Sequence, residues 1–132
     1  MLNVKATIQD HSFEFACRIV RLSEALYRES FATRSIARQL LSARTSVAAN
    51  LEEASGAQSK PDFISKSSIA AKEARESRYW LRLLVACHLV DEKKISPLVI
   101  ESGEIVAIMT TIVKNAAKSK SRGAHSTFNI QH

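Results

Sequence analysis

The chain has 132 residues, 45% of them hydrophobic and 24% charged, which fits one domain that buries a core without disulfides or metal ions. Three glycines, two prolines, few aromatic residues and the lack of any alternating run of β-branched residues argue against a β-sandwich or barrel. Nineteen basic and thirteen acidic residues give a net charge of +6, which favours anionic partners, with nucleic acid ahead of a membrane.

A first helix is predicted to follow a short arm of residues 1–11. Ser12 is a suitable N-cap for this helix, which is expected to run to about Arg28. Residues 29–32 then turn the chain, and Thr33 is the cap expected for the second helix. The apolar residues of the first helix recur at helical spacing: Phe15, Ile19, Leu22 and Leu26.

The stretch from Gln39 to Trp80 predicts two long helices joined by a short turn. Gly56 can end the first of them in the left-handed conformation, and Ser59 to Asp62 resemble a capping box that opens the second. Alternating spacings of three and four keep their apolar residues on one face, as in a left-handed antiparallel pair. The two stripes are Ile36, Leu40, Ala43, Val47, Leu51 and Ala54, and Phe63, Ala70, Ala74, Ser77, Leu81 and Leu84.

A second seam of small and polar residues lies beside each apolar stripe. If the chain folds back near residues 58–60, Asn50 comes opposite Ile69 and Ser46 opposite Glu73. We therefore predict a ladder of interhelical hydrogen bonds that fixes the register of the two helices. This structural polar seam consists of Gln39, Ser46, Asn50, Glu53, Lys66, Glu73 and Glu76.

The third helix is predicted to stop near Asp91, after which Ser96 and Pro97 open a fourth. Four helices with such short connections form an all-α, antiparallel up-down-up-down four-helix bundle, here assigned to residues 12–118. Residues 119–132 lack periodicity and are assigned as a basic, mobile C-terminal tail. The inward stripe of the fourth helix is Leu98, Ile105, Ile108, Met109, Ile112 and Val113.

Basic residues gather in two outward sectors of the predicted hairpin, one of them an arc of ~120° on the third helix. Repeated around an oligomer, they would contact phosphate groups and make binding salt-dependent; the alternative is an ordinary solvated face with local ion pairs. No aromatic residue was expected to interleave with them, which argues against base stacking. The nucleic-acid-binding residues predicted are Arg34, Arg38, Arg44, Lys72, Arg75, Arg78 and Arg82, with Lys114, Lys118, Lys120 and Arg122 as a basic extension.

The sequence predicts neither a metal site nor a catalytic one. The Glu-x-x-His pairs of a di-iron bundle are absent, as are nucleophile–base spacings and phosphate-binding glycine loops, so we expect no cofactor and no enzymatic activity. His88 is expected to be a hydrogen-bonded core residue, Trp80 part of the hairpin core, and Tyr79 an interface candidate. Cys17 and Cys87 lack metal-type spacing, and without a signal peptide at the start they predict reduced thiols in the cytoplasm.

The hairpin resembles the signature of the four-helix bundle family encoded in intervening sequences of bacterial 23S ribosomal RNA genes. Its helices match the family patterns QLLRSxTSVxANxxEA and SKxDFIxKLxIAxKEAxETxYWLxLL over about a third of the chain. Ser42 and Ala43 replace the Arg-Ser pair of the first pattern, an arginine follows at Arg44, and Ser67 replaces an apolar residue of the second. The polar and aromatic positions that match include Gln39, Thr45, Ser46, Asn50, Glu53, Lys66, Lys72, Glu73, Glu76, Tyr79 and Trp80.

This resemblance implies a homopentameric, ring-like assembly of bundles with no known enzymatic activity. It also relates the chain to the basic accessory protein of diversity-generating retroelements, which is similar in fold and binds a reverse transcriptase and nucleic acid. Two functions stay open at this point. The first is electrostatic contact with structured RNA or DNA, and the second is a protein-interaction scaffold such as an accessory subunit of a reverse transcriptase. No membrane partner is expected.

Overall fold

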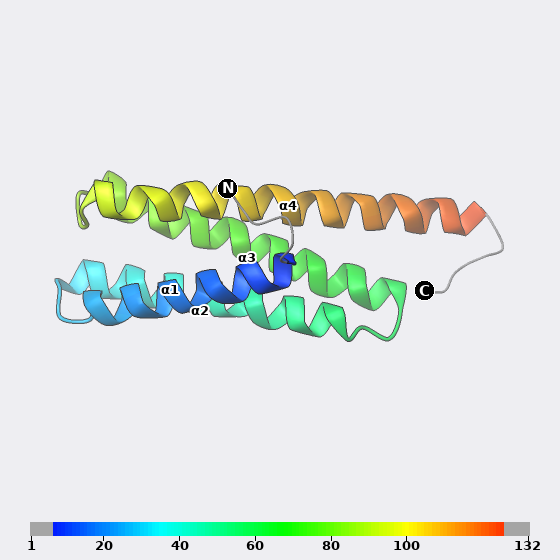
Figure 1. Cartoon of the computed structure of the whole chain (residues 1–132), viewed down its shortest axis with the longest axis horizontal. Helices are drawn as coiled ribbons and strands as arrows, with labels where there is room; N and C mark the ends of the chain where they lie inside the picture. The colour runs from blue at the N-terminus through cyan, green and yellow to red at the C-terminus, as the bar shows by residue number, and fades with distance from the viewer. Residues whose placement is uncertain (1–6, 126–132) are drawn as a thin grey trace.

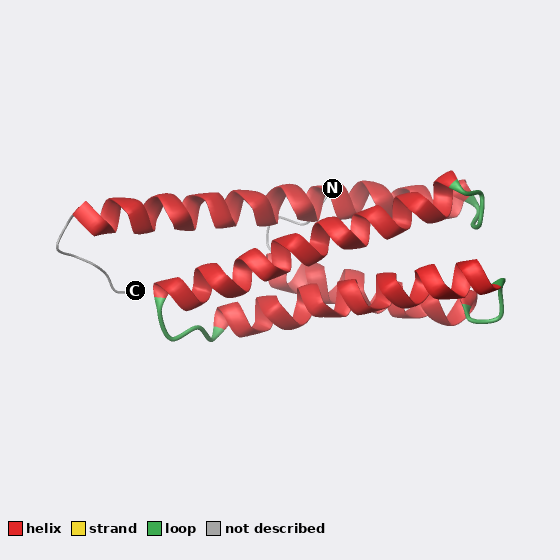
Figure 2. Ribbon diagram, turned by 180° about the vertical axis from the view of Figure 1, so that it is seen from behind, coloured by secondary structure: helices red, strands yellow, loops and turns green. Residues whose placement is uncertain are grey.

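The computed structural model describes residues 7–125, with side chains described as far as Lys118. Within that range the chain forms four helices, α1 (Ile8–Leu26), α2 (Phe31–Ser55), α3 (Lys60–Ala86) and α4 (Glu92–His125). Each connection is a short turn that reverses the chain, so successive helices are antiparallel (Figure 1, Figure 2). The predicted all-α, up-down-up-down four-helix bundle is confirmed.

The helices pack in chain order, and the bundle is open between its first and last helices. α2 lies between α1 and α3, and α4 packs along α3, whereas α1 and α4 make only sparse contact. In Figure 1, α1 stops short of the α2–α3 turn, while α4 runs along the whole of α3 and beyond its end. α1 is therefore held to the rest of the bundle chiefly through α2.

The core is built mainly from the apolar stripes that the helical spacing predicted, but Phe63 and Ile108 are only half-buried and lie outside the core cluster. Burying one large apolar side chain contributes about 1.5–3 kcal/mol, so these stripes supply the main force that holds the helices together. Small residues, among them Ala43 and Ala74, separate the large ones on α2 and α3 and let the two helices approach closely. The large apolar side chains with no exposed surface are Phe15, Ile19, Leu40, Val47, Leu81, Leu84, Ile105 and Met109.

The first two helices begin earlier than the sequence indicated. Thr7, not Ser12, caps α1: its hydroxyl accepts a hydrogen bond from the Asp10 N–H at 3.0 Å, and the Asp10 carboxylate accepts one from the Thr7 N–H at 3.3 Å. Ser30, not Thr33, caps α2, with its hydroxyl 3.2 Å from the Thr33 nitrogen. Ser12 and Thr33 are instead buried inside their helices, so both predicted caps were wrong.

The turn between α2 and α3 combines one confirmed and one incorrect prediction. Ser59 caps α3 as expected, because its hydroxyl accepts a hydrogen bond from the Asp62 N–H at 3.2 Å. Gly56 ends α2 with a φ of −99°, which is not the left-handed conformation. The turn reverses the chain without that conformation. A residue with a side chain could replace Gly56 without backbone strain, because its φ is negative.

Among the described residues, the left-handed conformation occurs at the other end of α3. His88 has a φ of 57°, and its N–H donates to the Val85 carbonyl, while the Leu89 N–H donates to the Leu84 carbonyl, both at 3.0 Å. This pair of bonds is the Schellman motif, which ends a helix by satisfying its last carbonyl groups. α3 therefore stops earlier than predicted, and His88 is exposed on a turn instead of buried in the core.

Replacing His88 with glycine should stabilise the protein by about 0.5–1 kcal/mol, because glycine adopts a positive φ without the clash of a Cβ atom. Urea unfolding of both proteins measures the change. His88→Ala is the matched control, since it removes the imidazole but keeps the Cβ. If alanine stabilises as much as glycine does, the gain does not come from the backbone conformation.

α4 also begins earlier than predicted. The Asp91 carboxylate accepts a hydrogen bond from the Lys93 N–H at 3.0 Å and caps a helix that starts at Glu92. Pro97, expected to open the helix, lies on an exposed side inside it, where it cannot donate to the carbonyl four residues earlier. The helix continues to His125, beyond the boundary at residue 118 assigned to the bundle.

The length and composition of α4 also match those of a membrane-spanning helix. The segment Glu92–Lys118 is long and apolar enough to cross a bilayer by these two criteria alone. The mostly buried core helix of a soluble protein meets the same criteria; here α4 packs along α3, and 22% of the apolar window is buried. The absence of a membrane partner stays a prediction.

Candidate nucleic-acid interface

Three of the four basic residues predicted on α3 point away from the bundle. Lys72, Arg75 and Arg82 are exposed, and Tyr79, with 53% of its surface accessible, lies between the two arginines in helical spacing. The Tyr79 ring packs edge-on against Trp80, with 5.0 Å between ring centroids. This face of α3 is therefore a cationic surface that carries an aromatic ring, contrary to the expectation that no aromatic residue would interleave with the arginines.

Arg78 is the exception on α3. It is half-buried, its Nε is covered, and a Cβ added to Gly103 of α4 would lie 3.3 Å from that atom. The glycine thus leaves the space in which the Arg78 side chain packs across the α3–α4 boundary. Arg78 is only partly available to a phosphate, because the Nε of its guanidinium is buried next to Gly103 of α4.

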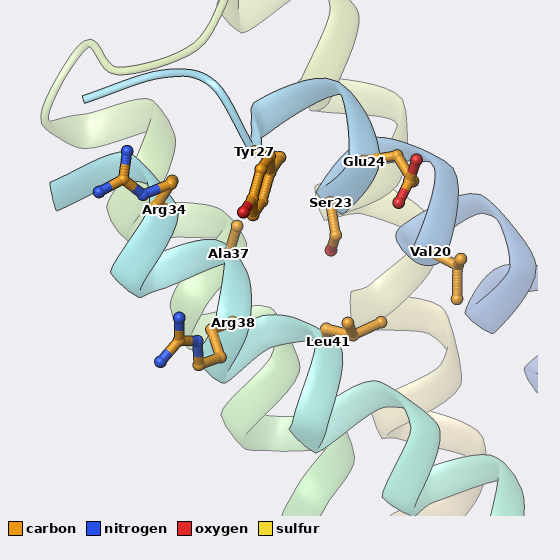
Figure 3. Close-up of a pocket in the computed structure, with 8 residues that line it drawn as sticks. All are labelled: Val20, Ser23, Glu24, Tyr27, Arg34, Ala37, Arg38 and Leu41. Carbon is orange, nitrogen blue, oxygen red and sulfur yellow. The ribbon is translucent and has the colours of Figure 1, made fainter. Parts of the chain in front are cut away.

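Arg34 and Arg38 are exposed on α2, where they line a groove between α1 and α2 (Figure 3). Tyr27 of α1 lines the same groove and is 70% exposed. Phe31, 77% exposed, precedes Arg34 by three residues and Arg38 by seven, which places the three on one side of α2. The prediction that no aromatic residue would lie among the basic residues is therefore wrong for α2 as well.

Arg44 is the clearest correction to the predicted site. It was assigned to the outward sector of α2, but none of its surface is accessible. α2 packs against α1 as well as α3, so its buried arc is wide. Ala37 and Leu51, seven residues before and after Arg44, are buried on the same side of the helix. Arg44 therefore cannot contact nucleic acid in this conformation.

The buried guanidinium of Arg44 lies over an aromatic ring. Its central carbon is 4.3 Å from the ring centroid of Phe15, and its Nη2 donates to the Ser12 hydroxyl at 3.2 Å. The Nε and Nη1 groups are buried without a hydrogen-bond partner among the described residues. Since a guanidinium has five N–H donors, this site leaves part of its hydrogen-bonding capacity unused.

Two further charges lie near this site and join α1 to α4. Arg18 donates to the Glu101 carboxylate at 2.6 Å, and its guanidinium also lies 5.1 Å from the Phe15 ring centroid. Burial lowers the pKa of Arg44 to about 10; the negative charge of Glu101 opposes this effect, and the positive charge of Arg18 adds to it. At neutral pH the cluster of Arg44, Arg18 and Glu101 thus holds two positive charges and one negative charge.

The polar seam does not form the predicted interhelical ladder. Asn50 donates to the Ser46 carbonyl at 2.9 Å and to its hydroxyl at 3.2 Å, and the Trp80 ring N–H donates to the Glu76 carboxylate at 3.2 Å. Each of these bonds stays within one helix. Gln39 and Glu53 are exposed, while the remaining seam residues are half-buried: Ser46, Asn50, Lys66, Glu73 and Glu76.

The predicted basic extension is described only in part. Lys114 and Lys118 are exposed on α4. Lys120 and Arg122 fall outside the residues whose side chains the structure describes. Cys17 and Cys87 are free thiols, and among the described residues no group of three or more His, Cys, Asp or Glu side chains is close enough to hold a metal ion.

The structure thus divides the predicted basic residues into separate surfaces. Arg34 and Arg38 extend from α2 at the rim of the α1–α2 groove, Arg78 at the edge of the α3 stripe packs against α4, and Arg44 is inside. The spacing of Phe31 with the α2 arginines was a signal in the sequence that could have revealed an aromatic component. The contribution of Tyr27 could not be read from the sequence, because it depends on how α1 packs on α2.

Fold and surface together define a small antiparallel helical bundle with cationic outer faces and one buried arginine. A family model for the 23S rRNA-intervening sequence protein matches residues 5–111, and the chain belongs to this family. A crystal structure of a protein with unknown function from the S23 ribosomal protein family of Bacteroides thetaiotaomicron is 39% identical. The match covers 81% of this chain and 95% of that one, with a TM-score of 0.73. Comparison with curated proteins finds no match.

Proposed function

We propose that this protein is a non-enzymatic, cytoplasmic bundle that contacts structured RNA or DNA through its basic outer faces. The observation that carries the proposal is the exposed α3 stripe of Lys72, Arg75 and Arg82, in a chain with a net charge of +6. Exposed cations at helical spacing follow a phosphate backbone without reading its sequence. The two free cysteines support a reducing compartment.

Salt dependence of binding tests this function. Each phosphate contact on duplex DNA contributes ~0.9 to the slope of log affinity against log salt concentration. The double variant Arg75→Gln/Arg82→Gln should therefore lower the slope for a labelled duplex by ~1.8. Lys93→Gln/Lys94→Gln removes the same charge from exposed residues at the start of α4 and should leave the slope nearly unchanged. Equal losses in both variants, or no binding even at low salt, would reject the proposal.

Assembly into an oligomer is part of the same proposal, with a ring of five copies expected from the family resemblance. Apolar side chains exposed on several helices, including Ile69 on α3 and Ile100 on α4, support a protein contact of this kind. Native mass spectrometry and sedimentation velocity measure the number of copies. A protein that stays monomeric at micromolar concentration would contradict the assembly.

The same exposed apolar residues support the second candidate, a scaffold that recruits a protein such as a reverse transcriptase as its accessory subunit. The two candidates differ in how binding responds to salt. Contact with phosphates weakens steeply as salt is added, whereas binding through buried apolar surface does not. Salt-insensitive binding to such an enzyme, with no affinity for the nucleic acid, would favour the scaffold.

A further inference from the structure

The groove between α1 and α2 is a concave site that the basic stripe on α3 does not include. It has a volume of about 210 Å³ and is lined by residues of both helices. This is smaller than the ~300–1,000 Å³ of pockets that enclose drug-sized ligands. The groove therefore suits one planar group that belongs to a larger molecule. Its lining consists of Val20, Ser23, Glu24, Tyr27, Arg34, Ala37, Arg38 and Leu41.

The groove has two distinct sides. Val20, Ala37 and Leu41 provide an apolar surface, and Tyr27 stands at one end of it (Figure 3). Arg34 and Arg38 extend from α2 on the outer side. An apolar site with an exposed aromatic ring and two adjacent cations is the combination by which proteins hold single-stranded nucleic acid, with the base stacked and its phosphates paired.

Polar atoms on α1 complete the site. The Ser23 hydroxyl is buried and has no hydrogen-bond partner among the described residues, although it lines the groove. Glu24 lines the same side and adds a carboxylate, which accepts hydrogen bonds from the amino group of a base or from a ribose 2′-hydroxyl.

We propose that this groove binds an unpaired nucleotide of a single-stranded RNA, with the base against Tyr27 and the flanking phosphates at Arg34 and Arg38. The inference rests on the proposed nucleic-acid function and deepens it, because it assigns a looped or unpaired region as the element recognised. RNA is favoured over DNA because the Glu24 carboxylate on the α1 side is an acceptor for the 2′-hydroxyl donor that DNA lacks.

Fluorescence anisotropy with a short unstructured RNA, the same RNA as a duplex and the DNA of the same sequence tests the site. Tyr27→Ala should weaken binding of the single-stranded RNA by about 5- to 150-fold and change duplex binding less than ~2-fold. Tyr27→Phe should restore most of the affinity, because it keeps the ring. Arg34→Gln/Arg38→Gln should lower the salt slope on the single strand by ~1.4. The wild-type protein should bind the RNA strand more tightly than the DNA strand.

Phe13→Ala is the matched control, since Phe13 is an exposed aromatic residue of α1 outside the groove. A 2-aminopurine base in the RNA gives a direct readout, because stacking on Tyr27 should quench its fluorescence in the wild type and not in Tyr27→Ala. If the wild type binds RNA but Tyr27→Ala and Phe13→Ala behave alike, the groove assignment is wrong while the proposed function stands.

Two other outcomes would also overturn the assignment. The first is a loss of RNA and duplex binding by the same factor in Tyr27→Ala, which would show that the ring does not select an unpaired base. The second is a change in oligomeric state of Tyr27→Ala in sedimentation velocity, which would mean that a second protein chain occupies the groove. If the wild type binds neither form of nucleic acid, the proposed function itself fails.

Discussion

Replacing Arg44 with methionine should raise the free energy of unfolding by about 1–3 kcal/mol. Arg44 is fully buried as a cation, donates one hydrogen bond to Ser12 and leaves Nε and Nη1 unpartnered among the described residues. Methionine fills a similar length of space without a charge and keeps contact with the Phe15 ring. The loss of the cation–π contact, worth about 0.5–2 kcal/mol, offsets part of the gain.

The lowered pKa of Arg44 supports the prediction that Arg44→Met stabilises the protein. Burial lowers the pKa from its ordinary value to about 10, which corresponds to about 3 kcal/mol against the charged form in the folded state. Because the folded pKa is below the unfolded value, the unfolded chain holds the proton more tightly. The cost is present in full below pH 10 and is relieved only above it. The stability gained by Arg44→Met should therefore be constant across neutral pH.

Urea unfolding measures the change, and two further substitutions separate charge from volume. Arg44→Lys keeps the charge but loses the flat guanidinium that stacks on Phe15, so it should be less stable than the wild type. Arg44→Ala removes the charge but leaves a cavity, and it should cost about 2–4 kcal/mol. If methionine destabilises as much as alanine, the charge itself contributes to stability and the interpretation of the cluster is wrong.

The hairpin was predictable because helical periodicity alone determines which residues share a face. Leu40, Val47 and Leu81 are buried as their spacing required. Helix starts were less predictable, since a serine or threonine that could cap a helix occurs at several neighbouring positions. Thr7 with Asp10 satisfies the capping pattern as well as Ser12 does, and only burial of Ser12 in the packed bundle decides between them.

The candidate site was harder to predict because it depends on contacts between helices. The spacing of Ala37, Arg44 and Leu51 places an arginine among buried residues, but a charged residue at such a position is ordinarily read as exposed. Arg44 is buried because α1 covers that side of α2 with Phe15. The α1–α2 groove arises from the same packing, so Tyr27 could not be assigned to it from periodicity.

The second large effect is expected at Phe15, the ring on which both Arg44 and Arg18 lie. Phe15→Ala should cost about 3–5 kcal/mol, since it leaves a cavity in the core and removes the aromatic face from two cations. Domains of this size are stable by only about 5–15 kcal/mol, so the loss is a large fraction of the total. Phe15→Leu keeps most of the apolar volume and should cost clearly less.

The open arrangement of the bundle determines which helix loses stability first in Phe15→Ala. α1 packs chiefly on α2 and is joined to α4 by the Arg18–Glu101 ion pair, so it can separate while α2, α3 and α4 remain folded. Hydrogen exchange in Phe15→Ala should therefore rise along α1 well before it rises in α3. Uniform exchange in all four helices would show that α1 is not a separate unit. A double-mutant cycle of Phe15→Ala with Arg44→Met should give a coupling of about 1–2 kcal/mol. Part of the cost of Phe15→Ala comes from the lost cation–π contact with Arg44, and that part is absent when residue 44 is an uncharged methionine.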